Sequence, residues 1–296
     1  KATALVSTIT VFDLTGVADE GASSIADQIA CHRALGWNHL ELRSIDAVPV
    51  ARLADEAWRA VVDQLQQHAM AVPVLASQIG NWGSRIAGDF AVDLAELDRL
   101  LEIAAPLGTR MIRIMSYPNS GWEEARWRAA VIERLCRLTE VAQRHDVVLV
   151  HENCAGWAGR SAEHTLDMLH AVGSDHLKLL FDVGNGLSYG YQALDFLREV
   201  WPHVAHVHLK DGLGSGQGVH YQELGEGEAG AVECIDFLLR NGYGGWFSIE
   251  PHLSLIPHLQ VSDDNPLRKQ ATYVAYARRV EHILNSRQGN AHVIHG

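Results

Sequence analysis

The chain has 296 residues, of which 47% are apolar, and its formal net charge is −12. This length suits one (β/α)8 barrel of about 250 residues, and the apolar fraction is ordinary for a globular core. The absence of a run near ~18 uninterrupted apolar residues argues against a membrane partner, and the acidic charge without a Lys/Arg cluster argues against nucleic acid.

The opening segment, KATALVSTITVF, is apolar but contains serine and threonine and leads into Asp13 without a small-residue cleavage pattern. We therefore predict a first strand here rather than a signal peptide. The four cysteines, Cys31, Cys136, Cys154 and Cys234, form no CxxC pair. That pattern argues against a structural zinc site or a disulfide scaffold, and we expect a cytoplasmic protein.

Short β-branched runs alternate with longer amphipathic stretches along the rest of the chain. The predicted strands are Ala4–Val11, His39–Arg43, Ala71–Ser77, Arg110–Met115, Val147–Glu152, Leu177–Asp182, Ala205–Lys210 and Phe247–Glu250. The predicted helices are Ala22–Leu35, Ala54–His68, Ala91–Leu107, Trp122–His145, Ala162–Val172, Ala193–Trp201, Ala229–Asn241 and Pro266–Asn285. Apolar residues at helical spacing support the helices, and Gly36 and Gly108 are stop signals.

Eight strand–helix units indicate a parallel sheet with right-handed crossovers, and eight units close naturally into a barrel. A doubly wound open sheet is the alternative, but no GxGxxG follows the first strand. The sequence thus predicts the α/β class, with a single (β/α)8 TIM barrel over residues 1–287 and a C-terminal tail over residues 288–296. A homo-oligomer is possible, since the long loop over residues 251–265 could be a lid or a subunit contact.

The last four predicted strands each end in a side chain that can bind a metal: Glu152, Asp182, His208 and Glu250. Strand alternation allows all four to point into the barrel mouth, where reactive groups of such barrels gather. A lone carboxylate at a strand end is more often a helix cap or an ion-pair partner, but four in succession favour a common site. Three converging carboxylates repel one another, and a divalent cation would offset that repulsion.

The ligand set of three oxygens and one imidazole suits a hard divalent ion. Mn²⁺ fits best, with Mg²⁺, Co²⁺ or Zn²⁺ as alternatives. An ion at this place would make a C–H next to a carbonyl acidic by stabilising an enediolate. Glu152 and Glu250 are the predicted catalytic pair, one removing the proton and the other returning it from the opposite face.

The stretches HENCAGW, FDVGNG, HVHLKDG and SIEPH, in this order and spacing, resemble the xylose-isomerase-like barrel superfamily. Within it they are similar to the sugar phosphate isomerase/epimerase group, which includes D-tagatose 3-epimerase and inosose dehydratase. The resemblance is strong over residues 147–251, and GWNHLEL resembles the family's second strand. It implies that Glu152, Asp182, His208 and Glu250 bind the metal, and that the two glutamates exchange a proton with a sugar-like substrate.

Asn185 occupies a position where the epimerases usually have a substrate-contacting histidine, and an arginine expected after HLKD is absent. The ligand set and the resemblance predict a metal-dependent isomerase or epimerase of a sugar or sugar derivative. The two departures argue against a simple free-ketose epimerase and leave a metal-dependent lyase on a keto-sugar or keto-inositol, including one that cleaves C-glycosides, as the alternative. A repair endonuclease also occurs in the superfamily, but the net charge speaks against it. A binding barrel without catalysis is a further alternative.

The candidate substrate-binding residues are Asn185, Lys210, Trp157 and His220. Lys210 could hold a substrate oxygen or phosphate, and a structural ion pair is an equal alternative. Trp157, like Trp82 and Trp122, could stack on a sugar face or simply pack. His220 lies in a loop that could reach the mouth, whereas His206 is more typical of a satisfied core histidine.

Overall fold

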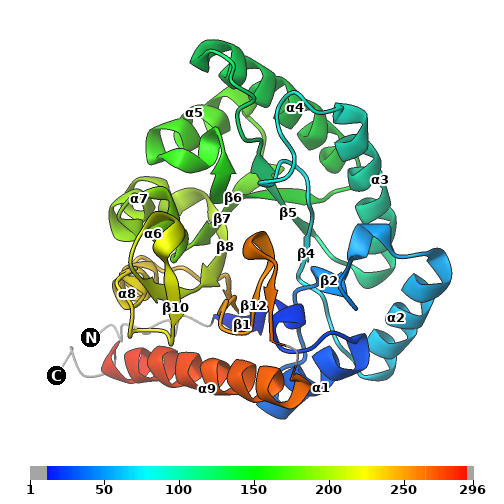
Figure 1. Ribbon diagram of the computed structural model, residues 1–296, viewed down its shortest axis with the longest axis vertical. Helices are drawn as coiled ribbons and strands as arrows, with labels where there is room; N and C mark the ends of the chain where they lie inside the picture. The colour runs from blue at the N-terminus through cyan, green and yellow to red at the C-terminus, as the bar shows by residue number, and fades with distance from the viewer. Residues whose placement is uncertain (1–11, 264, 292–296) are drawn as a thin grey trace, which may run out of the picture.

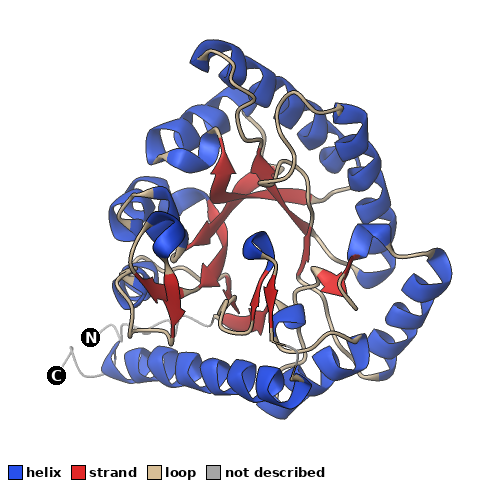
Figure 2. Ribbon diagram, in the orientation of Figure 1, coloured by secondary structure: helices blue, strands red, loops and turns tan. Residues whose placement is uncertain are grey.

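The structure is a computed structural model that describes residues 12–263 and 265–291. A ring of helices surrounds a curled parallel sheet (Figures 1 and 2). Its strand order is β1-β11-β8-β7-β6-β5-β4. These strands are β1 (Asp13–Gly16), β4 (Val74–Ala76), β5 (Met111–Ser116), β6 (Val148–Gly156), β7 (Leu177–Asp182), β8 (Val204–Leu209) and β11 (Trp246–Ile249).

Residues 38–42 close the sheet into a barrel between β1 and β4. The Glu41 amide donates to the Gly16 carbonyl (2.9 Å), and the Ala76 amide donates to the Leu42 carbonyl (2.8 Å). This segment is the predicted second strand, and it is present as bridges at His39, Glu41 and Leu42 rather than as a continuous strand. With it, the barrel has eight strand positions, which confirms the predicted (β/α)8 fold.

The helices follow the strands in the predicted alternation. They are α1 (Ile25–Leu35), α2 (Asp55–Gln67), α3 (Phe90–Leu107), α4 (Glu124–Arg144), α5 (Ala162–Val172), α6 (Asn185–Tyr189), α7 (Ala193–Val200), α8 (Ala231–Arg240) and α9 (Pro266–Ala291). Gly36 and Gly108 adopt the left-handed conformation that ends α1 and α3, as the glycine stop signals predict. None of the helices in the described part combines the length and apolarity needed to cross a membrane.

The predicted first strand, Ala4–Val11, lies outside the described residues, and the strand that pairs with β11 is Asp13–Gly16. Helix α9 continues through Ala291, past the predicted start of the tail at residue 288. The one-domain boundary at residue 287 stays a prediction.

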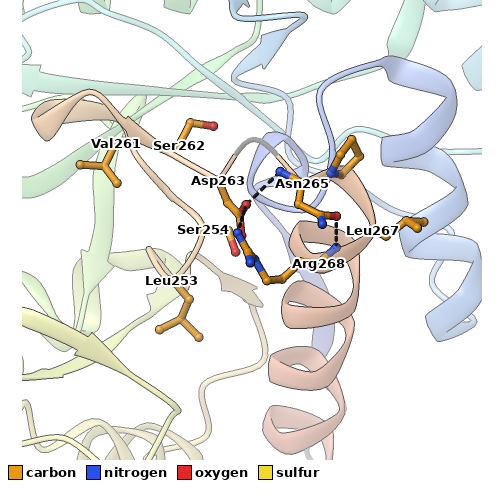
Figure 3. A pocket seen from close by; sticks show the side chains of 9 residues that line it. Leu253, Ser254, Val261, Ser262, Asp263, Asn265, Leu267 and Arg268 are labelled. Atoms are coloured by element: carbon orange, nitrogen blue, oxygen red, sulfur yellow. Dashed lines mark hydrogen bonds and ion pairs between the residues drawn. The ribbon is translucent and has the colours of Figure 1, made fainter.

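In the described residues, three short antiparallel hairpins lie outside the barrel sheet. They are β2 (Ser44–Ile45) with β3 (Val48–Pro49), β9 (Asp211–Leu213) with β10 (His220–Gln222), and β12 (Leu255–Ile256) with β13 (Val261–Ser262). The β12–β13 hairpin, drawn in orange, lies over the centre of the ring in Figure 1. Beyond it, Asp263 accepts hydrogen bonds from the Arg268 side chain and the Asn265 amide, which joins the hairpin to α9 (Figure 3).

Asp211 fixes the glycine-rich loop that precedes α8. Its carboxylate accepts four backbone N–H groups, those of Gly212 (2.9 Å), Gly225 (2.9 Å), Gly227 (3.2 Å) and Ala229 (3.1 Å). A Cβ atom on Gly227 would lie only 2.1 Å from Asp211 Oδ1. The glycine is therefore needed for close approach of the backbone to the carboxylate.

Candidate metal centre at the barrel mouth

The four predicted metal ligands converge at the carboxyl ends of their strands. We call Glu152, Asp182, His208 and Glu250 the acidic cluster. Asp182 on β7 is the register partner of His208 on β8, and Glu250 directly follows β11. One ligand atom from each residue lies within 4.8 Å of the others, and none of the four residues is more than 3% exposed. The predicted inward orientation of the four side chains is therefore what the structure has.

Local turns hold the carboxylates of the acidic cluster in place. Asp182 Oδ1 accepts the amides of Gly184 (2.7 Å) and Asn185 (3.0 Å), at the start of α6. The Asn185 side chain then donates to Glu152 Oε1 (2.9 Å). A Cβ atom on Gly184 would lie 2.8 Å from Lys210 Cγ, so glycine here lets the lysine approach. Asp182 and Glu152 thus each have one oxygen held by hydrogen bonds from the protein.

The remaining atoms of the acidic cluster face one another. Glu152 Oε2, Asp182 Oδ2 and His208 Nδ1 are buried and form no hydrogen bond within the described part of the chain. Two of them have cations nearby without hydrogen-bond geometry. Arg113 lies 3.3 Å from Glu152 Oε2, and Lys210 Nζ lies 2.8 Å from Asp182 Oδ2. Buried polar atoms that lack partners are costly, and a shared ion would satisfy all three.

A second charged group lies beside the first. We call Asp19, Glu20, Arg43 and His252 the arginine cluster. Arg43 donates to both Asp19 oxygens (3.0 and 2.8 Å) and to Glu250 Oε1 (2.7 Å). Glu20 accepts the backbone amide and the Nδ1–H of His252, both at 2.7 Å. Although Glu20, Glu250 and His252 are close enough to share an ion, the guanidinium already supplies the positive charge.

Charge is not balanced across the mouth. Five carboxyl groups, those of the two clusters, contact three cations, namely Arg43, Arg113 and Lys210. Full ionisation would leave two negative charges. Accordingly, burial raises the pKa of Asp182 to about 7 although Lys210 opposes the shift. Burial likewise raises the pKa of Glu20 to about 8. A divalent ion would neutralise the excess.

The acidic cluster opens into a cavity of about 580 Å³, a size typical of small-molecule sites. Arg43, Arg113, Asn185, Lys210, Tyr221 and His252 line it together with the two glutamates. The hairpin contributes Pro257, His258 and Leu259, and the His258 ring lies 6.0 Å from that of Trp82.

The predicted substrate-binding residues divide into two groups. Asn185 and Lys210 line the cavity, and Lys210 also donates to Glu250 Oε2 (3.0 Å). Trp157 is buried outside the cavity lining, where it stacks on His164 and donates to Glu124. His220 is exposed on β10, and its neighbour Tyr221 faces the cavity instead. The structure therefore does not bring Trp157 and His220 to the acidic cluster.

Several residues at the mouth are missing from the sequence prediction. Glu41 and Arg43 share one face of the predicted second strand, and Arg113 interrupts the apolar fourth strand. A charged residue facing into a barrel is a usable signal, because it must find partners there. Glu20 precedes α1 in a short 3-10 turn (Ala18–Glu20), and no local pattern marks it.

Comparison with known proteins gives one curated relative, an uncharacterized protein of Methanocaldococcus jannaschii. It is 27% identical over 121 residues, which are 39% of this chain and 41% of the relative. The match thus spans less than half of that relative's length.

Solved structures share the fold at low sequence identity. An L-ribulose 3-epimerase is 17% identical with a TM-score of 0.71, over 97% of this chain and 99% of that chain. A xylose isomerase-like TIM barrel protein of Mycobacterium smegmatis in complex with magnesium is 18% identical with a TM-score of 0.67, over 96% of this chain and 99% of that chain. A probable 3-DHS dehydratase of Bacillus anthracis is 16% identical with a TM-score of 0.64, over 81% of this chain and 92% of that chain.

The family described as xylose isomerase-like TIM barrel matches residues 30–271, which include the closing segment of the barrel and all four residues of the acidic cluster. The fold agrees with that description strand by strand. The chain belongs to the xylose isomerase-like TIM barrel family.

Proposed function

We propose that this chain is a divalent-metal-dependent isomerase or epimerase that acts on a sugar or sugar derivative. The observation that carries the proposal is the acidic cluster, in which three buried ligand atoms that lack hydrogen-bond partners among the described residues face a common point. Such a site at the carboxyl ends of barrel strands is where enzymes of this fold place their chemistry. Charged side chains that line the cavity, among them Arg43, Arg113 and Lys210, would bind the hydroxyl groups of a small polyhydroxylated ligand.

The residues present fit one hard divalent ion, held by Glu152, Asp182, His208 and Glu250. Three carboxylates and one imidazole favour Mn²⁺, with Mg²⁺, Co²⁺ or Zn²⁺ as alternatives, and one structural neighbour is described as a magnesium complex. When bound, the ion would supply electrophilic stabilisation of negative charge that develops on substrate oxygens. Lys210 contacts Asp182 and Glu250 and would hold a further substrate oxygen beside them.

The two glutamates differ in their surroundings, as an acid/base pair requires. Glu250 accepts from Arg43 and Lys210, and although burial raises its pKa, Lys210 first, then His252 and His208, hold the pKa well below its ordinary value. Glu152 accepts a hydrogen bond from the neutral Asn185 amide and forms an ion pair with Arg113. We propose that Glu250, which stays ionised, takes the proton next to the carbonyl, and that Glu152 returns one from the opposite face through an enediolate.

A lyase on a keto-sugar or keto-inositol is the second candidate. It begins with the same proton removal and then expels a leaving group. Asn185 favours it, because this amide bonds to Glu152 where a substrate-contacting histidine is expected in the epimerases. A probable dehydratase among the structural neighbours has the same fold.

Incubation of the Mn²⁺-loaded protein with a panel of free, phosphorylated and C-glycosidic ketoses in D₂O tests the proposal. Isomerase or epimerase activity predicts deuterium at the carbon next to the carbonyl, without loss of water or of an aglycone. Loss of either group supports the lyase. If neither exchange nor loss occurs across the panel, and the wild-type protein does not bind Mn²⁺, the proposed function is wrong.

A further inference from the structure

Glu41 is a completely buried carboxylate behind the acidic cluster. It lies in the segment that closes the barrel, between β1 and β4. Its oxygens contact three side chains: His208 Nε2 at 3.1 Å, His206 Nε2 at 2.9 Å and Ser248 Oγ at 2.8 Å. No lysine or arginine in residues 12–263 or 265–291 forms an ion pair with it. Such a carboxylate must be held entirely by these donors.

The contact fixes which His208 nitrogen carries a proton. A carboxylate only accepts, so the nitrogen beside Glu41, Nε2, must donate. The opposite nitrogen, Nδ1, then points into the acidic cluster, 3.4 Å from Glu250 Oε2 and 3.9 Å from Asp182 Oδ2. It has no hydrogen-bond partner in the described part of the chain. An imidazole whose Nε2 is protonated presents its lone pair at Nδ1, which is what a metal requires.

The strands around Glu41 also fix the orientation of the ring. Ser248 on β11 is the register partner of His208 on β8, and both contact the same carboxylate. His206 lies two residues before His208 on the same face of β8, and its Nε2 also contacts Glu41. The carboxylate thus links the segment that closes the barrel to β11 and β8.

We propose that Glu41 is a positioning residue of the metal centre, which holds His208 in the ring orientation and tautomer that present Nδ1 to the ion. This inference rests on the proposed metal site. Loss of an outer partner of a metal-binding histidine typically weakens metal affinity about 10- to 100-fold. We expect a change of that size when the carboxylate is removed.

The test is Mn²⁺ titration by calorimetry of wild-type protein, Glu41→Gln and the matched control Glu163→Gln. The control makes the same substitution at an exposed residue in the first turn of α5. We expect one strong site in wild type and in Glu163→Gln, and about 10- to 100-fold weaker binding in Glu41→Gln. Equal affinity in Glu41→Gln and wild type overturns the inference. A wild-type protein that does not bind Mn²⁺ overturns the proposed function itself.

A second readout separates positioning from general loss of structure. Long-range ¹⁵N–¹H correlation of the metal-free protein reports which His208 nitrogen is protonated. We expect Nε2 in wild type and a shift toward the other tautomer in Glu41→Gln. An unchanged tautomer would contradict the proposal. If Glu41→Gln does not fold, Glu41→Asp keeps the charge but withdraws the oxygens from His208, and it should show a smaller loss of Mn²⁺ affinity.

Discussion

The two charged clusters at the barrel mouth meet where Arg43 donates to Glu250 of the acidic cluster, but they satisfy their charges differently. In the arginine cluster, Arg43 contacts three carboxyl groups, and both oxygens of Glu20 are held by His252. In the acidic cluster, three buried ligand atoms have no hydrogen-bond partner in the described residues. Proximity of carboxylates and histidines is therefore not enough to indicate a metal site. The difference lies in whether the protein already supplies the cation and the donors.

Removal of the internal cation should have the largest effect on stability. Arg43→Ala leaves Asp19, Glu20 and Glu250 without their guanidinium, and we expect a loss of about 3–5 kcal/mol in the free energy of unfolding. Urea titration measures it. Arg110→Ala, which breaks the exposed pair with Asp146, should cost less than about 1 kcal/mol. Equal stability of Arg43→Ala and wild type would contradict the comparison. Binding of a second Mn²⁺ by Arg43→Ala would show that the guanidinium takes the place of a cation in the arginine cluster.

Removal of a ligand should abolish strong metal binding with little effect on the arginine cluster. Asp182→Asn takes away one of the three carboxylates, and we expect Mn²⁺ affinity to fall by more than about 100-fold, beyond the usual effect of an outer partner. Calorimetry provides the measurement. The same substitution at the exposed Asp175 should leave the affinity unchanged. Wild-type affinity in Asp182→Asn would show that the ion, if any, binds elsewhere.

Asn185 tests how far the acidic cluster depends on neutral donors. Asn185→Ala removes the side-chain hydrogen bond to Glu152 Oε1, and we expect about 10-fold weaker Mn²⁺ binding because Glu152 is less well oriented. Asn241→Ala, at the exposed end of α8, is the matched control. If Asn185→Ala binds as tightly as wild type while its catalytic rate falls, the residue contacts substrate rather than supporting the metal.

His32 shows what burial does to a histidine whose side-chain partners in the described residues are a backbone carbonyl and a tyrosine hydroxyl. Burial lowers its pKa from 6.5 to about 4. The unfolded state therefore binds an extra proton between these values, and stability falls as pH falls through this window. From pH 6.5 to pH 5 the loss is about 2 kcal/mol. His32→Gln should lose less stability over this range, as urea titrations at both pH values would show. The exposed control His203→Gln should behave as wild type, and equal pH dependence of His32→Gln and wild type would contradict the assignment.

The sequence predicted the alternation of elements well, because the strands of the second half are continuous apolar runs that end in polar residues. The predicted strand Leu177–Asp182 is the observed β7. The first two strand positions were harder. β1 has only four residues, and residues 38–42 pair through single bridges. Such segments are defined by their neighbours in the closed barrel, which no local pattern records.

The acidic cluster could be predicted because its residues lie at strand ends, whereas Glu20 and His252 of the arginine cluster lie outside regular strands. The residues of the acidic cluster end consecutive strands, so alternation alone places them on one face. Glu20 lies in a short 3-10 turn, and His252 has a left-handed backbone conformation with a φ of 54°. The alternation of strand residues says nothing about where such side chains point. Trp157 illustrates the reverse problem, because a tryptophan in a mouth loop can equally turn back to stack on a helix residue, here His164.

The carboxylate of Asp211 has a consequence for how freely the segments outside the barrel sheet can move. Three backbone amides, those of Gly225, Gly227 and Ala229, would lose their acceptor if the loop over residues 225–229 moved, so Asp211 holds this loop in place. The β12–β13 hairpin, which contributes Pro257, His258 and Leu259 to the cavity, is joined by two residue pairs. We therefore expect the hairpin to change position more readily than the loop.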